Sequence, residues 1–182
     1  SGLCLEGKFE RVACLRPLVG DDEAVLSDAR GKLSLAGQVT LLLSRVIESL
    51  GSFDSLSEAQ VRQMTVGDRE RLLLALCVDA LGDELDLVGR CPNEDCEELT
   101  EISVSLSGFI ERGVPGEPAL TFEKEFDCQG QCVQVRFRLP TGDDQEPLAR
   151  EMLRGDVNAG ERLFADCLGG VRDETGQVLD AR

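Results

Sequence analysis

The chain has 182 residues, 42% of them hydrophobic, and its 35 acidic residues against 19 basic ones give a formal net charge of −16. This length suits one domain with a sizeable core or two small subdomains. The negative charge repels phosphate backbones and anionic membrane surfaces, so no nucleic-acid or membrane partner is expected. No apolar run approaches the ~20 residues of a membrane helix, and the first residues lack a signal pattern, so we expect a soluble protein made in the cytoplasm.

Residues 1–85 are predicted to form a helical region. In LAGQVTLLLSRVIESLG the apolar residues recur three or four positions apart as far as Leu50, and Gly51 is a stop signal, so one amphipathic helix is expected to run to that glycine. A second helix is expected in TVGDRERLLLALCVDALGDEL, capped by Thr65 and ending near Gly82. The two apolar stripes are expected to pack against each other.

Residues 86–139 are predicted to form antiparallel β-structure, because the hydrophobic period changes there from about 3.6 to 2. Apolar and polar side chains alternate in EISVSL and in CVQVRFRLP, and a further strand is expected in ALTFEKEF between them. The stretch GVPGEP, residues 113–118, is predicted to be a connecting loop.

Residues 140–182 are predicted to be helical again. The stretch TGDDQEPLAREML begins with Thr141 as a helix cap, and AGERLFADCLGG is expected to form a further short helix that closes at its two final glycines. The tail VRDETGQVLD is expected to form a small hairpin about Thr175 and Gly176. The fold class is therefore α+β, with helical subdomains flanking a small antiparallel, zinc-ribbon-like sheet, and no internal repeat is evident beyond two pairs of cysteines.

Four of the eight cysteines form two close pairs, Cys91 with Cys96 and Cys128 with Cys132. Zn²⁺ favours four soft ligands in a tetrahedron, and turns at strand ends can bring two such pairs together. A catalytic zinc keeps one position open and commonly uses histidine, which this chain lacks. The four thiolates therefore predict a structural zinc site that replaces part of a hydrophobic core. Two oxidised pairs and unpaired thiols are the alternatives.

The densest carboxylate cluster lies in GDDQE, residues 142–146. A hydrolase that uses Asp143, Asp144 or Glu146 is one hypothesis, because carboxylates serve as general acids and bases. Acids in the first turn of a helix also stabilise its dipole and cap its amides, and this structural interpretation is the one adopted here. No glycine-rich stretch has the spacing of a phosphate-binding loop, so neither catalysis nor a small-molecule substrate is expected.

Four segments, taken in order, resemble baseplate-hub proteins of contractile phage tails and of related extracellular contractile injection systems. They are LRPLVGDDEAVL, VGDRERLLLAL, LGDELDLVGRCPNEDC followed by EISVSL, and FRLPTGDDQEPLAR. The resemblance spans residues 16–168, and the matching positions are Gly67–Glu70, Cys91 with Cys96, and Pro140–Glu146.

The resemblance implies a non-enzymatic particle component that assembles around the spike and inner tube, with other baseplate, spike and tube proteins as its partners. Such a protein is made in the cytoplasm and becomes part of a phage-tail-like particle. A zinc-stapled cytosolic adaptor or assembly chaperone, absent from the finished particle, is the alternative. Cys128 and Cys132 are not a fixed feature of the family, so a metal that Cys91 and Cys96 share with another chain also stays open.

Overall fold

The computed structural model describes residues 2–93, 96, 98–110, 119–128, 130–173 and 175–179. The chain is α+β, as expected. Its helices are α1 (Gly20–Ala29), α2 (Leu35–Val46), α3 (Glu58–Gln63), α4 (Val66–Leu81), α5 (Ser107–Ile110), α6 (Gly142–Leu153) and α7 (Ala159–Cys167). Its strands are β1 (Leu3–Leu5), β2 (Lys8–Glu10), β3 (Ala13–Leu15), β4 (Ile47–Leu50), β5 (Phe53–Asp54), β6 (Glu84–Arg90), β7 (Leu99–Ser105), β8 (Phe122–Cys128), β9 (Gln131–Phe137), β10 (Leu168–Asp173) and β11 (Val178–Leu179).

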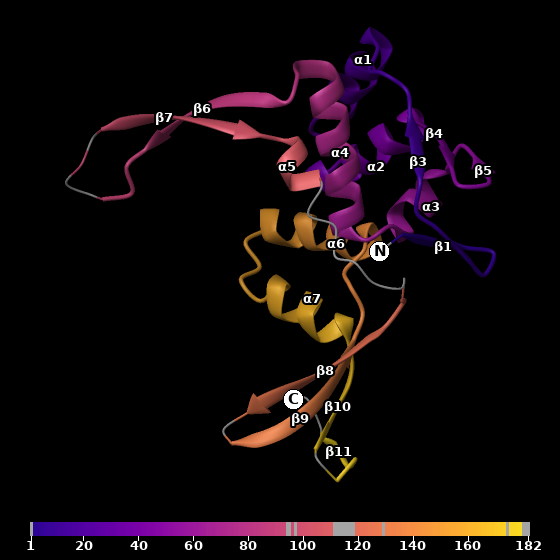
Figure 1. The fold of residues 1–182 in the computed structure, drawn as a ribbon, viewed down its shortest axis with the longest axis vertical. Coiled ribbons are helices and arrows are strands. Elements are labelled where there is room, and N and C mark those ends of the chain that lie inside the picture. Colours follow the sequence, from indigo (N-terminus) through magenta and orange to yellow (C-terminus); the bar gives the residue numbers. More distant parts are fainter. Residues whose placement is uncertain are drawn as a thin grey trace.

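The strands form small antiparallel sheets that are attached to a central group of helices (Figure 1). The described strands pair as β1-β2, β3-β4-β5, β6-β7 and β11-β10-β9-β8. The β6–β7 hairpin projects from the end of α4, while the four-stranded sheet extends beyond α7 at the other end of the molecule (Figure 1). Among the described helices, none is both long and apolar enough to cross a membrane.

The hydrophobic core lies in the first half of the chain, between α2, α3, α4 and the β3-β4 strands. Its side chains are buried almost completely, because α2 presents apolar residues at helical spacing to the apolar side of α3 and α4. The core residues are Leu3, Leu5, Leu43, Val46, Ile47, Leu50, Leu56, Val61, Met64 and Leu76.

Two parts of the chain repeat the same order of elements, strand, helix, helix, strand, strand. The first unit is β3-α1-α2-β4-β5 and the second is β9-α6-α7-β10-β11. Both units pair their strands in the same way, with the central strand bonded to the other two, and in both the register shifts where the first strand meets the central one. This internal repeat was not predicted.

The same local motif begins both units. An arginine is followed after three residues by Gly-Asp-Asp, as Arg16 to Asp22 and as Arg138 to Asp144. The backbone N–H of Arg16 donates to the carbonyl of Val46, the last residue of α2, at 2.9 Å. The N–H of Arg138 donates to Cys167 O, at the end of α7, also at 2.9 Å. The repeat therefore includes the tertiary hydrogen bond between the end of the second helix and the residue that follows the first strand.

Two predicted helix ends are wrong. The helix expected to reach Gly51 ends at Val46, because Ile47 adopts extended backbone angles and Ile47–Leu50 pairs with β3 instead. β-Branched residues fit this pleated, half-buried setting better than the end of a helix. The glycines expected to close α7 lie inside β10, since α7 ends at Cys167.

Other predicted elements are confirmed. Thr65 caps α4, accepting a bond from the backbone N–H of Asp68 at 3.2 Å, and Gly82 is the C-cap residue. The three predicted strands are β7, β8 and β9, and the tail forms the β10–β11 hairpin. They do not form one ribbon, because β7 pairs with β6 in a separate sheet. The predicted loop at 113–118 lies outside the described residues.

Candidate functional site

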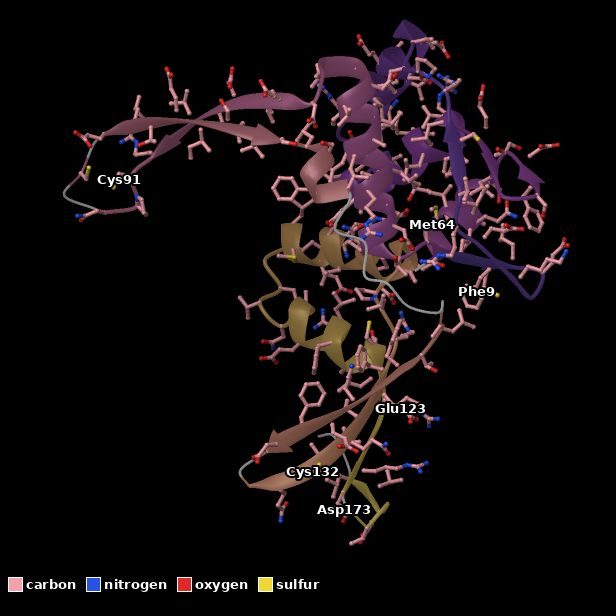
Figure 2. The ribbon with its side chains drawn as sticks, viewed as in Figure 1. Phe9, Met64, Cys91, Glu123, Cys132 and Asp173 are labelled. Carbon is pink, nitrogen blue, oxygen red and sulfur yellow. The ribbon has the colours of Figure 1, made fainter. Side chains whose placement is uncertain are left out.

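The two cysteine pairs lie on different hairpins, which the structure does not bring together. Cys91 and Cys96 flank the tip of β6–β7, where the N–H of Cys91 donates to Glu98 O at 3.0 Å. Cys132 lies in β9, and Figure 2 shows it far from Cys91, at the other end of the molecule. No group of three or more histidine, cysteine or acidic residues within the described ranges is placed to hold a metal ion. The described structure therefore does not bring together the four thiols of the expected zinc site.

The second pair is also divided between the two faces of its own hairpin. Cys128 is opposite Gln131 in the β8–β9 ladder, and Cys132 is opposite Asp127. Directly opposed residues share a face, whereas successive residues alternate between faces, so the two thiols point to opposite sides of the sheet. In this register the two thiols are not placed to bind one ion together. Cys91 and Cys96 would supply two of the four ligands that a structural zinc takes.

The segments Met64–Glu70 and Pro140–Glu146 meet at one junction, although they are far apart in sequence. The N–H of Val66 donates to Pro140 O at 2.9 Å, and the N–H of Gly142 donates to Met64 O at 3.1 Å. Thr65 and Thr141 form an isolated antiparallel bridge between these bonds. The starts of α4 and α6 are thereby held side by side.

Arg69 lies at the centre of this junction and is only 1% exposed. Its Nη2 donates to Ala36 O at 2.7 Å and to Thr40 Oγ1 at 2.8 Å. The Thr40 hydroxyl in turn donates to Glu146 Oε1 at 2.6 Å, so one hydroxyl links the buried cation to a buried carboxylate. Burial lowers the pKa of Arg69, and the charges of Glu146 and Asp143 oppose that shift. The network joins α2, α4 and α6, because each helix contributes one of its members.

Two nitrogens of Arg69, Nε and Nη1, are buried without a hydrogen-bond partner among the described residues. Gly142 packs directly on the guanidinium, where an added Cβ would overlap Nη1 and lie 2.9 Å from Arg62 O. A residue without a side chain is therefore required at this position. The sequence held a signal for Arg69, since it falls in register with the apolar residues Leu72 and Leu76 of α4, but that signal was overlooked.

The carboxylates considered for catalysis take part in structural contacts. Asp144 accepts from Arg138 through both oxygens, at 2.6 and 2.8 Å, and from the Thr141 N–H at 2.8 Å. The hydrogen bond from Arg138 lowers the pKa of Asp144 to about 2. Glu146 accepts from Thr40, and Asp143 lies 3.3 Å from Nε of Arg62. These contacts favour the interpretation of helix capping over an acid–base pair.

Asp22 repeats the arrangement of Asp144 in the first unit. It accepts from both terminal nitrogens of Arg16, at 2.7 and 2.8 Å, and from the N–H of Val19 at 3.1 Å. Arg45 adds a further contact to Asp22 at 3.0 Å. The hydrogen bond from Arg16 is the main cause that lowers the pKa of this carboxyl, and burial opposes it. Each unit is thus fastened at its first helix by a bidentate arginine–aspartate pair.

An apolar groove of about 670 Å³ lies between α7 and the β8-β9-β10 strands. Phe164 and Phe126 line it although 67% and 51% of their surfaces are exposed. Arg138 supplies the charged group of the lining, and its guanidinium is already paired with Asp144. The lining residues are Phe126, Val135, Phe137, Arg138, Leu139, Pro140, Gly160, Leu163, Phe164, Cys167 and Leu168.

The β6–β7 hairpin is a second exposed apolar surface. Its seven residue pairs run in regular register from Glu84 opposite Ser105 to Arg90 opposite Leu99. Leu87 and Ile102 face each other on one side and are 45% and 48% exposed. Both outer edges are unpaired in this two-stranded sheet of the described structure. We call the hairpin, residues 84–105, the β-arm.

Comparison of the chain with protein-family models, with curated proteins and with solved structures gave no significant match to any of them.

Proposed function

We propose that this chain is a non-enzymatic structural subunit of a larger assembly, and that the assembly is the baseplate or hub of a contractile injection particle. The observation that carries the structural part of the proposal is the β-arm. An isolated two-stranded hairpin is marginally stable in water, and its unpaired edges and exposed apolar side chains invite pairing with another chain.

The β-arm lacks several of the devices that protect a free edge. Its register contains no bulge, and neither strand contains proline or lysine, although both strands carry charged residues. Val88 and Leu99 leave 66% and 65% of their surfaces exposed on the face opposite Leu87. A hairpin with apolar residues on both faces is suited to lie between neighbouring subunits, where both faces are covered.

The baseplate or hub assignment depends on the resemblance, whose matching positions are Gly67–Glu70, Cys91 with Cys96, and Pro140–Glu146. The first and last of these segments lie at the junction around Arg69, where the starts of α4 and α6 are held together. The partners in this proposal are other baseplate, spike and tube proteins. In this proposal Cys91 and Cys96, at the tip of the β-arm, share a structural zinc with ligands from such a neighbour.

Purification of the assembled particles tests the proposal. We expect the chain to co-purify with spike, tube or wedge proteins, and deletion of its gene to prevent assembly of functional particles. Fully assembled and functional particles after deletion would contradict it. A chain that is required for assembly but missing from finished particles would instead identify the adaptor or chaperone.

A further inference from the structure

The second helix of each repeated unit, α2 or α7, has an equivalent apolar face, and the two units differ in what covers it. The ends of their second helices are equivalent, since Val46 and Cys167 each accept the N–H of the unit's arginine. Counting back three residues from these ends gives Leu43 in the first unit and Phe164 in the second. Leu43 is fully buried, whereas Phe164 is 67% exposed.

The strands next to these helices are equivalent in the same way. Leu15 is paired with Ile47 in the first unit, and Phe137 is paired with Leu168 in the second. Leu15 packs against the hydrophobic core and Ile47 belongs to it. Phe137 and Leu168 line the open groove instead. The groove of the second unit therefore lies where the first unit has its core.

The first unit shows what closes such a face. The segment that follows β5 forms α3 and α4, which cover α2 and β4 with buried apolar side chains, among them Val61, Met64 and Leu76. In the part of the chain that the structure describes, no helix takes the corresponding place over α7 and β10. The first unit is thus an internal template for the occupant of the groove.

We infer that the groove between α7 and the β8-β9-β10 strands binds an amphipathic helix of a partner protein. The helix presents apolar side chains at three- and four-residue spacing, as α4 presents them to α2. A second copy of this chain fits less well, because two molecules of net charge −16 repel each other. The inference deepens the proposed function and rests on it only in taking the partner to be another subunit.

The probe is a peptide of residues 65–82 with Cys77→Ser, stapled on its polar face to hold it as a helix and carrying a fluorescent label. Its sequence is that of the helix that covers the first unit. We expect the anisotropy of the label to rise on addition of the full chain. A scrambled peptide of the same composition should bind at least about tenfold more weakly.

Matched variants locate the binding site. Phe164→Asp should weaken binding of the probe at least about tenfold, because it places a charge in the groove. Leu153→Asp, at a residue of α6 that is 81% exposed and outside the groove, should leave binding unchanged. Both residues are exposed, so both variants should retain the circular dichroism spectrum of the parent chain.

Three results would overturn the inference. They are equal binding of the two peptides, unchanged binding by the Phe164→Asp variant, and a concentration-dependent dimer in native mass spectrometry that this variant abolishes. Binding of an apolar dye that the helical peptide fails to displace would assign the groove to a small molecule instead. None of these results bears on co-purification with particles, so failure of the inference is distinct from failure of the proposed function.

Discussion

The first and second repeated units share their elements, their strand order and their arginine–aspartate ion pair, yet among the described residues only the first unit has a closed core. Leu43 and Val46 are fully buried under α3 and α4, while the equivalent face of α7 borders an open groove. In this chain, the contacts that hold the elements of a unit together are therefore distinct from the contacts that bury its apolar face. The ion pair and the strand contacts set the unit's geometry, and a further helical segment supplies the apolar closure.

The junction around Arg69 connects the two units and is expected to show the largest effect. Arg69→Ala leaves the Glu146 carboxylate buried without its cation and opens a cavity, so we expect the free energy of unfolding to fall by about 3–5 kcal/mol. Arg150→Ala removes an exposed arginine that also approaches Glu146, at 3.9 Å, and should cost less than about 0.5 kcal/mol. Urea denaturation measures both, and equal effects would show that burial of the Arg69 network is unimportant.

The contrast between covered and open faces predicts unequal costs at equivalent positions. Leu43→Ala removes a fully buried side chain and should destabilise the protein by about 2–5 kcal/mol. Phe164→Ala removes a larger side chain that is mostly exposed, and should cost less than about 1 kcal/mol. The denaturant midpoints of the two variants measure these two losses of stability. A larger loss for Phe164→Ala would mean that the second unit is packed as tightly as the first.

The two glycines of the repeated motif, Gly20 and Gly142, lie in different surroundings, so their substitution should have different effects. An alanine at Gly142 would push into the Arg69 guanidinium, and we expect a loss of about 3 kcal/mol from overpacking. Gly20 is the equivalent residue of the first unit, and a Cβ there would meet nothing within 4 Å. Gly20→Ala should therefore be neutral or stabilise α1 by about 0.5–1 kcal/mol. Thermal unfolding of both variants distinguishes a crowded position from an ordinary first helical residue.

The arginine–aspartate pairs predict a dependence on acid. The folded-state pKa of Asp144, about 2, lies below its ordinary value of 3.8, so the pair stabilises the fold above about pH 4 and this contribution is lost as the pH falls toward 2. Asp144→Asn should cost about 2 kcal/mol at neutral pH, and the difference from the parent should vanish near pH 2. The free energy of unfolding of both proteins, measured as a function of pH, checks this prediction. A difference that is constant with pH would show that the carboxylate is not held ionised by Arg138.

The sequence predicted much of the local structure because local signals were sufficient there. The Thr65 cap, the Gly82 end of α4 and the alternating residues of β7 and β9 depend on neighbours in the chain, and the structure confirms them. The helix that ends at Val46 shows where local sequence signals are insufficient. Ile47 and Leu50 continue the helical pattern, yet they are taken into a strand by pairing with β3, which is distant in sequence.

The arrangement of the cysteine pairs and the internal repeat could not be read from the sequence, for different reasons. Two close pairs on one chain do not determine which sheet each hairpin joins, and the separation of β6–β7 from β8–β9 is a tertiary outcome. The repeat left a visible trace, because Arg-x-x-x-Gly-Asp-Asp occurs at Arg16 and at Arg138. The equivalence of Val46 and Cys167 could be recognised only once their hydrogen bonds to these arginines were seen. Arg69 was missed because a charged residue in an apolar stripe is usually exposed, whereas here it is buried between helices.

Hydrogen exchange of the second helices tests most directly the claim that one unit is closed and the other open. Amides of α2, Leu35–Val46, should exchange only when the whole protein unfolds. Amides of α7, Ala159–Cys167, should exchange at least about a hundredfold faster in the free chain and become protected when the partner helix binds. Equal protection of α2 and α7 in the free chain would contradict it, because the second unit would then be as firmly closed as the first.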